Sequence, residues 1–256
     1  MNFNKRKRDF LKAAGTIVLV SGLGGPEVVA NAAVVPASNF VQAKNVPGTA
    51  DEPDIKIGDS WTYEERDGYN HNLKSRWTGD VISAEGIERG GIGVFFLDSS
   101  GGTYRRDWTH SYGRPWNLSK QVFPGGREIS FEPALLSLPF PLEAGRSWRQ
   151  DVAVTDSATG KSRTWKVYGK VRGWEKVKVP AGEFLALKVV KDIYLGDADW
   201  WRSETRRSEV DWYTPAVKWI VKHEEAEDYY AEGDLGLQYG DRTVWELVSY
   251  TVRDWP

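Results

Sequence analysis

Residues 176–189 read KVKVPAGEFLALKV, and this stretch indicates the fold of the chain. Valine alternates with lysine up to Val179, and the turn residues Pro-Ala-Gly follow. Beyond the turn, Leu185, Leu187 and Val189 continue the alternation. Apolar side chains at every second position are typical of antiparallel strands with one covered face. The stretch therefore predicts a β-hairpin.

The same period of two recurs along much of the chain, for example from Trp165 to Val171 and from Val244 to Val252. Turn signals such as Asp67-Gly68 and Gly125-Gly126 separate the alternating runs. Residues 132–138 are expected to form a helical turn, because prolines follow directly. The pattern predicts a mostly β protein with few short helices.

The chain carries an internal repeat. Gly58-Asp-Ser-Trp61 recurs as Gly145-Arg-Ser-Trp148, and the Lys-Ser-Arg run at 74–76 recurs at 161–163 with the same offset. Two long copies predict a duplicated sheet rather than a solenoid. We expect a first β repeat at 55–137 and a second at 138–256. They would form two tandem, related, curved antiparallel sheets of half-barrel or sandwich type.

The amino terminus predicts export. Residues 1–12 hold five basic side chains, an apolar run follows at 13–23, and Ala30-Asn-Ala32 is a small-residue cleavage site. We expect a signal peptide at 1–32, cleaved near Ala32. The run is shorter than the roughly 20 residues that cross a bilayer, so no transmembrane segment is expected after cleavage. Residues 33–54, rich in proline and small residues, predict a flexible linker.

The export route is less specific than export itself. Residues 7–12, KRDFLK, resemble the twin-arginine motif, with lysine in place of the first arginine. The general secretory route therefore remains an alternative. On either route, the expected location is periplasmic or extracellular.

Charge and composition exclude several function classes. Removal of residues 1–32, with five basic and two acidic side chains, shifts the net charge from −2 to −5, which disfavours nucleic-acid binding. The chain has no cysteine, so disulfides and thiolate chemistry are absent. His71, His110 and His223 lack metal-ligand spacing and are expected on the surface. No catalytic or nucleotide motif occurs, so we expect no cofactor, no metal and no catalytic residues.

Three motifs carry a resemblance to a known group of proteins. They are Gly145-x-x-Trp148, the V-P-A-G-x-F run at 179–184, and Trp212-Tyr-Thr-Pro215. This order resembles uncharacterised bacterial exported β-sheet proteins, in which the motifs mark successive hairpins of a curved sheet. The arrangement is similar to the half-barrels of periplasmic lipoprotein carriers. The resemblance covers residues 138–223, with a weaker echo in 53–112, and implies a fold but no reaction.

The 13 tryptophans suggest a binding role. Those in alternating runs are expected in the core: Trp61, Trp148, Trp165, Trp219 and Trp245. Those in polar or loop contexts are candidate ligand-binding residues: Trp108, Trp116, Trp174, Trp200 and Trp201. The leading hypothesis is a non-enzymatic binding protein of the cell envelope. Its concave sheet would hold a lipid-like, apolar or amphipathic ligand or a segment of an envelope protein.

Carbohydrate binding or glycoside hydrolysis is the alternative. Asp197 and Asp199 lie beside Trp200 and Trp201, and glycosidases use paired carboxylates near aromatic platforms. The arginines interleaved at 202–207 instead favour a solvated hairpin with paired charges. The acidic run at 224–234 lacks calcium-loop spacing and is expected to be a solvated strand end or loop. A purely structural envelope component is a further possibility.

Overall fold

The computed structural model describes residues 48–83, 90–98, 103–113, 116–197, 201–233 and 236–253, and for 82–108 it describes the backbone alone. The predicted signal peptide (residues 1–32) and the linker residues 33–47 lie outside the described residues. Residues 49 and 50, which were expected inside the linker, instead form a short strand. No described helix is both long enough and apolar enough to cross a membrane.

Strands make up nearly all of the described chain. The first seven are β1 (Thr49–Ala50), β2 (Ser60–Asp67), β3 (Leu73–Ser83), β4 (Gly90–Asp98), β5 (Thr103–Gly113), β6 (Asn117–Val122) and β7 (Glu128–Leu135). The others are β8 (Leu142–Glu143), β9 (Ser147–Asp156), β10 (Lys161–Val179), β11 (Gly182–Gly196), β12 (Arg202–Thr214), β13 (Trp219–Ala231) and β14 (Leu237–Thr251). A short 3-10 helix, η2 (Pro215–Val217), joins β12 to β13.

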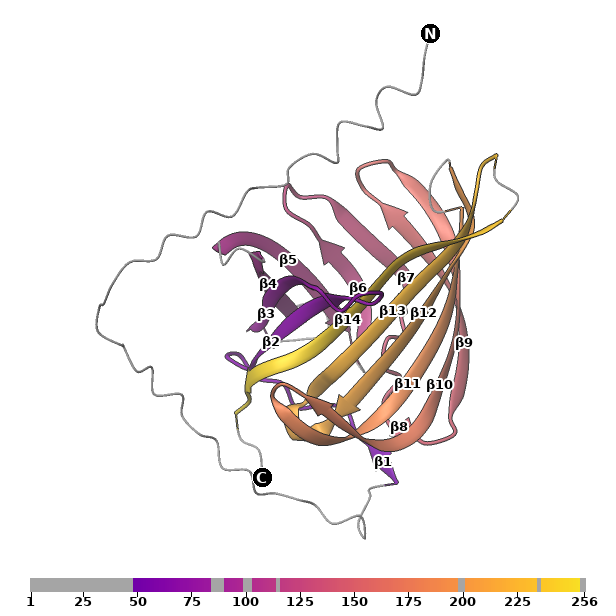
Figure 1. Cartoon of the computed structure of the whole chain (residues 1–256). Helices are drawn as coiled ribbons and strands as arrows, with labels where there is room; N and C mark the ends of the chain where they lie inside the picture. The colour runs from indigo at the N-terminus through magenta and orange to yellow at the C-terminus, as the bar shows by residue number, and fades with distance from the viewer. Residues whose placement is uncertain are drawn as a thin grey trace, which may run out of the picture. The chain divides into compact units, whose positions relative to one another are not determined.

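Twelve of these strands pair in a continuous antiparallel ring (Figure 1). Most neighbours in the ring are also neighbours in sequence. Two pairings join strands that are not consecutive: β14 joins β2, which lies far away in the sequence, and β7 joins β9, which follows after the short strand β8. The remaining strands, β1 and β8, form a separate two-stranded sheet.

The expectation of a mostly β protein built from curved antiparallel strands is confirmed. The two expected sheets, however, are joined edge to edge through the β14–β2 and β7–β9 pairings and form one ring. The expected helical turn at 132–138 is wrong. Most of it belongs to strand β7, because residues 129–132 pair with β9 and Leu135 pairs with β6.

The two G-x-x-W motifs adopt the same local structure. Gly58 and Gly145 have φ angles of 92° and 91°, and the following strands begin at Ser60 and Ser147. The amide of Gly58 donates to the carbonyl of Val81, and the amide of Gly145 donates to that of Val171. In each copy the tryptophan pairs with a glycine of the next long strand. The sequence repeat therefore corresponds to a repeated strand entry.

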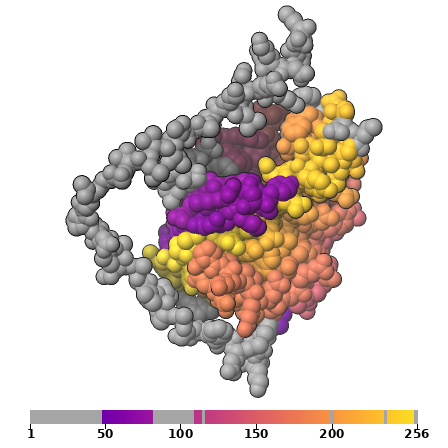
Figure 2. Space-filling model, viewed as in Figure 1, coloured from indigo at the N-terminus to yellow at the C-terminus, as the bar shows by residue number. Residues whose placement is uncertain are grey.

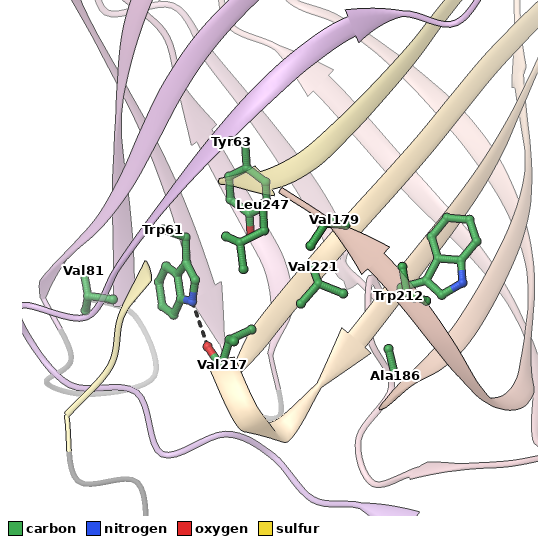
Figure 3. Packing of buried hydrophobic residues seen from close by; sticks show 10 residues of the cluster. Trp61, Tyr63, Val81, Val179, Ala186, Trp212, Val217, Val221 and Leu247 are labelled. Carbon is green, nitrogen blue, oxygen red and sulfur yellow. Dashed lines mark hydrogen bonds between the residues drawn. The ribbon is translucent and has the colours of Figure 1, made fainter. Parts of the chain in front are cut away.

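One hydrophobic cluster gathers residues that lie far apart in the sequence, from Trp61 to Leu247 (Figure 3). The Trp61 indole is 1% exposed, and its Nε1 donates to the carbonyl of Val217 at 2.7 Å. Tyr63, from the same strand, donates through its hydroxyl to the carbonyl of Ile220. These two bonds attach β2 to the η2–β13 segment, which lies more than 150 residues later in the sequence.

The β10–β11 hairpin folds against the later strands. Its loop is the Pro180-Ala181 pair, with Val179 paired to Gly182. The Ala181 amide donates to the carbonyl of Leu247 in β14 at 2.9 Å. The ribbon and space-filling views both show this hairpin against the β13–β14 region (Figures 1 and 2). The V-P-A-G-x-F motif is therefore a tight turn, as its sequence predicts.

A buried lysine joins the two ends of the described chain. The Lys218 Nζ donates to the carbonyl oxygens of Asp54 and Arg253 at 2.8 and 2.7 Å. It also lies 3.5 Å from the carboxylate of Asp59, which is 0% exposed and accepts from the Arg253 amide. This arrangement holds the chain before β2 and after β14 against η2.

Candidate functional site

Charged side chains occupy the inner face of the ring on three neighbouring strands. In β11, buried side chains alternate with exposed or partly exposed ones from Leu187 to Leu195, and Lys191 is one of the buried positions. Lys191 pairs with Glu209 of β12, and Asp211 of β12 pairs with His223 of β13. We call the inward-facing charged set the ionic network; it comprises Lys191, Arg202, Arg207, Glu209, Asp211, His223, Glu225 and Glu227.

Lys191 lies between two carboxylates at the centre of this network. Its Nζ is 2.7 Å from Glu209 Oε2 and 2.8 Å from Asp211 Oδ2. Burial disfavours the protonated amine, but the two carboxylates outweigh that effect and raise the pKa of Lys191. The site therefore contains an ammonium that stays charged although it is almost fully enclosed.

His223 extends the network into β13. Its Nδ1 is 2.6 Å from Asp211 Oδ1, which is a charge-assisted hydrogen bond. Burial alone would lower the pKa of this imidazole, but the adjacent Asp211 raises it to about 9. Burial would likewise raise the pKa of Asp211, yet Lys191 and His223 hold it well below its usual range. At neutral pH the three groups are ionised together.

Arg207 continues the network along the sheet, away from His223. Its guanidinium donates to Glu227 at 2.6 Å and lies 3.5 Å from Glu225. Unlike the Lys191–Asp211 pair, Arg207 and Glu225 keep 25% and 26% of their side-chain surface exposed. This part of the inner face is therefore accessible to solvent.

Aromatic rings from β2, β3 and β14 flank the charges. The Trp245 indole of β14 stacks on the His223 imidazole with centroids 4.4 Å apart. Trp77 meets Trp245 edge-on at 5.2 Å, and Tyr63 stacks on Trp77 at 4.5 Å. A continuous row of rings thus leads from β2 to the ionic network.

Two nitrogen donors at this junction have no acceptor among the described residues. They are Nε2 of His223 and Nε1 of Trp245, and both atoms are buried. His223 Nε2 is 3.7 Å from Glu225 Oε2, which is too long for a direct hydrogen bond. Buried donors without acceptors are uncommon in proteins, so such groups are candidates for ligand contact.

An apolar cluster begins on β11, beyond Lys191, and continues over β10, β9, β7 and β6. Its buried members are Leu118, Phe131, Leu135, Val152, Val154, Val167, Ile193 and Leu195. Trp165 packs on it, with its ring 5.7 Å from that of Phe131, and the Arg207 guanidinium lies 5.7 Å above the Trp165 ring. The apolar cluster therefore meets the ionic network at Trp165.

The candidate tryptophans divide between separate places. Trp116 packs against Trp219 and Tyr112, and its Nε1 is 3.4 Å from the carbonyl of Pro53. Trp116 and Trp174 both pack on the cluster around Leu142 and Tyr213.

Trp201 lies elsewhere, edge-on to Tyr229 at 5.5 Å, with the Arg202 guanidinium above both rings. The Trp108 side chain and Trp200 lie outside the described residues. A binding role for each of these five residues stays a prediction.

The alternative acidic pair is only partly described. Asp197 accepts from the Glu204 amide at 3.3 Å, which places it in the turn between β11 and β12. Asp199 lies outside the described residues. The carboxylates farther along the same hairpin, Glu209 and Asp211, are the ones that reach the inner face.

Two expectations about charged residues are wrong. His223, expected on the surface, is 6% exposed, and burial lowers the pKa of His110 to about 4. His110 lies beside Tyr112 and Gln121. The acidic run at 224–234, expected to be solvated, places Glu225 and Glu227 next to Arg207.

A sequence signal for this arrangement exists in the period of two. Arg207, Glu209 and Asp211 share one face of β12, and His223, Glu225 and Glu227 share one face of β13. That face continues the apolar face of β11. Among the described residues, no group of three or more histidine or acidic side chains is arranged to hold a metal ion.

Comparison with known proteins assigns no family. No family model and no curated protein matches the chain. A candidate lipoprotein from Parabacteroides distasonis matches with 14% identity and a TM-score of 0.43, over 79% of this chain and 99% of the other. A candidate exported protein with a YmcC-like fold from Bacteroides fragilis matches with 13% identity and a TM-score of 0.48, over the same shares.

The hypothetical lipoprotein YmcC from Escherichia coli matches with 12% identity and a TM-score of 0.40, over 75% of this chain and 84% of the other. Neither the identities nor the TM-scores are high enough to transfer a family, an activity or a location to this chain.

Proposed function

We propose that the chain is an exported, non-enzymatic binding protein of the cell envelope that holds an amphipathic ligand on the inner face of its ring. Export rests on the signal peptide predicted at residues 1–32, followed by the linker predicted at 33–54. The predicted repeats at 55–137 and 138–256 would each contribute one part of the enclosing wall.

One observation carries the binding role. Arg207 and Glu225 face inward, yet each keeps about a quarter of its side chain exposed. Interior side chains just fill a closed ring of about eight strands, and wider rings enclose ligands or water. This ring has twelve strands. Inward-facing charges with accessible surface support an interior that admits a guest molecule.

The inner face has an apolar part and a charged part, and this division indicates what kind of ligand fits. The apolar cluster around Phe131 and Ile193 suits a hydrocarbon chain. The ionic network, beginning at Arg207, suits a polar group. Trp165 lies where the two regions meet, and indoles favour boundaries between apolar and polar surroundings. Both ends of an amphipathic molecule would find matching surroundings.

A matched pair of arginines tests the proposal. Arg206 and Arg207 are adjacent in β12, with Arg206 exposed and Arg207 directed inward. Delipidated protein is titrated with dodecyl-chain amphiphiles while tryptophan fluorescence is recorded. We expect saturable binding that Arg207→Gln weakens about tenfold and Arg206→Gln leaves unchanged, since a hydrogen bond to a charged group contributes about 1.5–3 kcal/mol.

The test has a clear negative outcome. Circular dichroism checks that each variant retains its strand content. If folded wild-type protein gives neither a fluorescence change nor a lipid adduct in native mass spectrometry, the binding proposal is wrong. Carbohydrate binding through Asp197, Asp199 and Trp200 stays a prediction, because no described contact favours it over the inner face.

A further inference from the structure

Two buried donors define the point where the polar group of a ligand would attach. His223 and Trp245 stack with an interplanar angle of 30°, and neither Nε2 of His223 nor Nε1 of Trp245 has an acceptor among the described residues. The other ring nitrogen of His223 is already bound to Asp211. An unpaired buried donor is unfavourable, so an acceptor supplied by a ligand would be favourable here.

The position of Glu225 restricts the chemistry of that acceptor. His223 Nε2 and Glu225 Oε2 are 3.7 Å apart. An oxygen atom about 2.8 Å from both would bridge them once a neighbouring side chain moves, because Nε2 has almost no accessible surface in this conformation. Such an oxygen must accept from the imidazolium and donate to the carboxylate. A hydroxyl group does both, whereas an ionised carboxylate or phosphate oxygen only accepts.

The charges on the inner face around His223 also disfavour an anionic ligand. The ionic network contains equal numbers of positive and negative side chains. The positive ones are Lys191, Arg202, Arg207 and protonated His223, and the negative ones are Glu209, Asp211, Glu225 and Glu227. Glu65, opposite Trp245 in the register, adds a further carboxylate and accepts from Ser75 at 3.0 Å. The described wall therefore has no surplus positive charge with which to pair an anionic ligand.

We infer that the ligand presents an uncharged hydroxyl group, which accepts from His223 Nε2 and donates to Glu225. The inference rests on the proposed function and adds the chemical class of the ligand's polar end. Trp245 Nε1 is a second donor for the same oxygen or for its neighbour in a polyol. A glyceride or a sugar-headed amphiphile carries such hydroxyls, and the ionised carboxylate of a fatty acid does not.

Three ligands with similar chains separate these classes. The delipidated protein is titrated at pH 7.5 with 1-monododecanoylglycerol, dodecyl maltoside and dodecanoate, each below its critical micelle concentration. We expect dodecanoate to bind at least about tenfold more weakly than the better of the two hydroxyl ligands, a difference of about 1.4 kcal/mol. The glyceride and the maltoside distinguish a glycerol hydroxyl from a sugar hydroxyl.

Two variants locate the contact. Trp245→Phe keeps an aromatic ring but removes the donor, so it should weaken the hydroxyl ligand about threefold to tenfold. Glu225→Gln removes the carboxylate nearest to His223 Nε2. The ratio of the affinity for the hydroxyl ligand to the affinity for dodecanoate should therefore fall about fivefold. Glu224→Gln is the matched control, because Glu224 is 42% exposed and pairs with Lys222. It should leave all three affinities unchanged.

The outcomes separate this inference from the proposed function. If dodecanoate binds as tightly as both hydroxyl ligands, the hydroxyl inference is overturned while interior binding stands. If Glu225→Gln leaves the preference unchanged, the assigned contact is overturned. If none of the three amphiphiles binds folded protein, the proposed function falls and the inference falls with it.

Discussion

His223 Nδ1 lies 2.6 Å from Asp211 Oδ1, across the register that pairs β13 with β12. The same carboxylate receives Lys191 on its other oxygen. One buried aspartate thus holds a protonated imidazole and an ammonium on the inner face of the ring. Because each group depends on its partners for ionisation, the stability of the fold is linked to pH.

At alkaline pH, the dependence of the unfolding free energy on pH should reflect the deprotonation of His223. The folded-state pKa of about 9 exceeds the ordinary value of about 6.5, so the unfolded chain releases this proton first as pH rises. The stabilisation is complete below pH 6.5 and is lost as pH rises through about 9. We expect the unfolding free energy from urea titrations to fall by on the order of 3 kcal/mol over this window.

The acidic limb should report other groups. Burial lowers the pKa of His110 to about 4, so protonation of the unfolded chain reduces stability as pH falls from 6.5 towards 4. Below about pH 4, protonation of Asp211 removes a further contribution, because its pKa is depressed in the folded state. Stability should therefore be highest near pH 6.5.

His223→Gln should flatten only the alkaline limb of the stability profile. If the alkaline limb is unchanged in this variant, the loss of stability at high pH belongs to another group.

Lys191→Met should be strongly destabilising. It leaves the carboxylates of Glu209 and Asp211 enclosed without their shared cation. Removing one member of a buried ion pair lowers stability by about 3–5 kcal/mol. Lys166→Met, at an exposed position of β10, should change it by less than about 0.5 kcal/mol. Equal unfolding midpoints for the two variants in urea would show that the Lys191 contacts contribute little.

Gly169→Ala tests the repeated tryptophan–glycine pairing. A Cβ at Gly169 would lie 2.0 Å from Cζ2 of Trp148, so the indole must move. We expect a loss of about 1–3 kcal/mol, the range for overpacking. At Gly236 the nearest atom would be 3.9 Å away, so Gly236→Ala is the control and should be nearly neutral. The contrary result is a Gly169→Ala melting temperature within 1–2 °C of wild type, about the effect of a neutral substitution.

Lys218→Met should release the end of the described chain locally. The Lys218 Nζ holds the carbonyl of Arg253, and Asp59 accepts from the Arg253 amide. Without the ammonium, the buried Asp59 loses its closest cation. Hydrogen exchange should accelerate at the Arg253 amide more than in β11, which lies elsewhere in the ring. Uniform acceleration would instead indicate general destabilisation.

Local patterns in the sequence are enough to predict most of the architecture. The alternation in residues 176–189 marks a hairpin because exposed and buried faces alternate strictly in a strand. The turn at Pro180-Ala181 carries its own chemical signature, and the G-x-x-W copies adopt matching strand entries. The closure of the sheet depends on the β14–β2 pairing, which links segments far apart in the sequence and leaves no local signal, and on the β7–β9 pairing, which skips the short strand β8.

The sequence alone does not reveal the inner site, and the reason is physical. Arg207, Glu209 and Asp211 look like a solvated hairpin because charged residues are seldom buried without partners. Their partners, Lys191 and His223, belong to two other strands and become neighbours only through the register. A search for charged residues that continue the apolar face of β11 would have found all five.

The most direct test of interior binding is a crystal structure with 1-(12-bromododecanoyl)glycerol, located by the anomalous signal of its bromine. We predict a bromine peak inside the ring near the apolar cluster of Phe131 and Ile193, with the glycerol group beside His223 and Glu225. A fully occupied bromine site on the outer surface of the strands, with the inner face unchanged, would contradict the account.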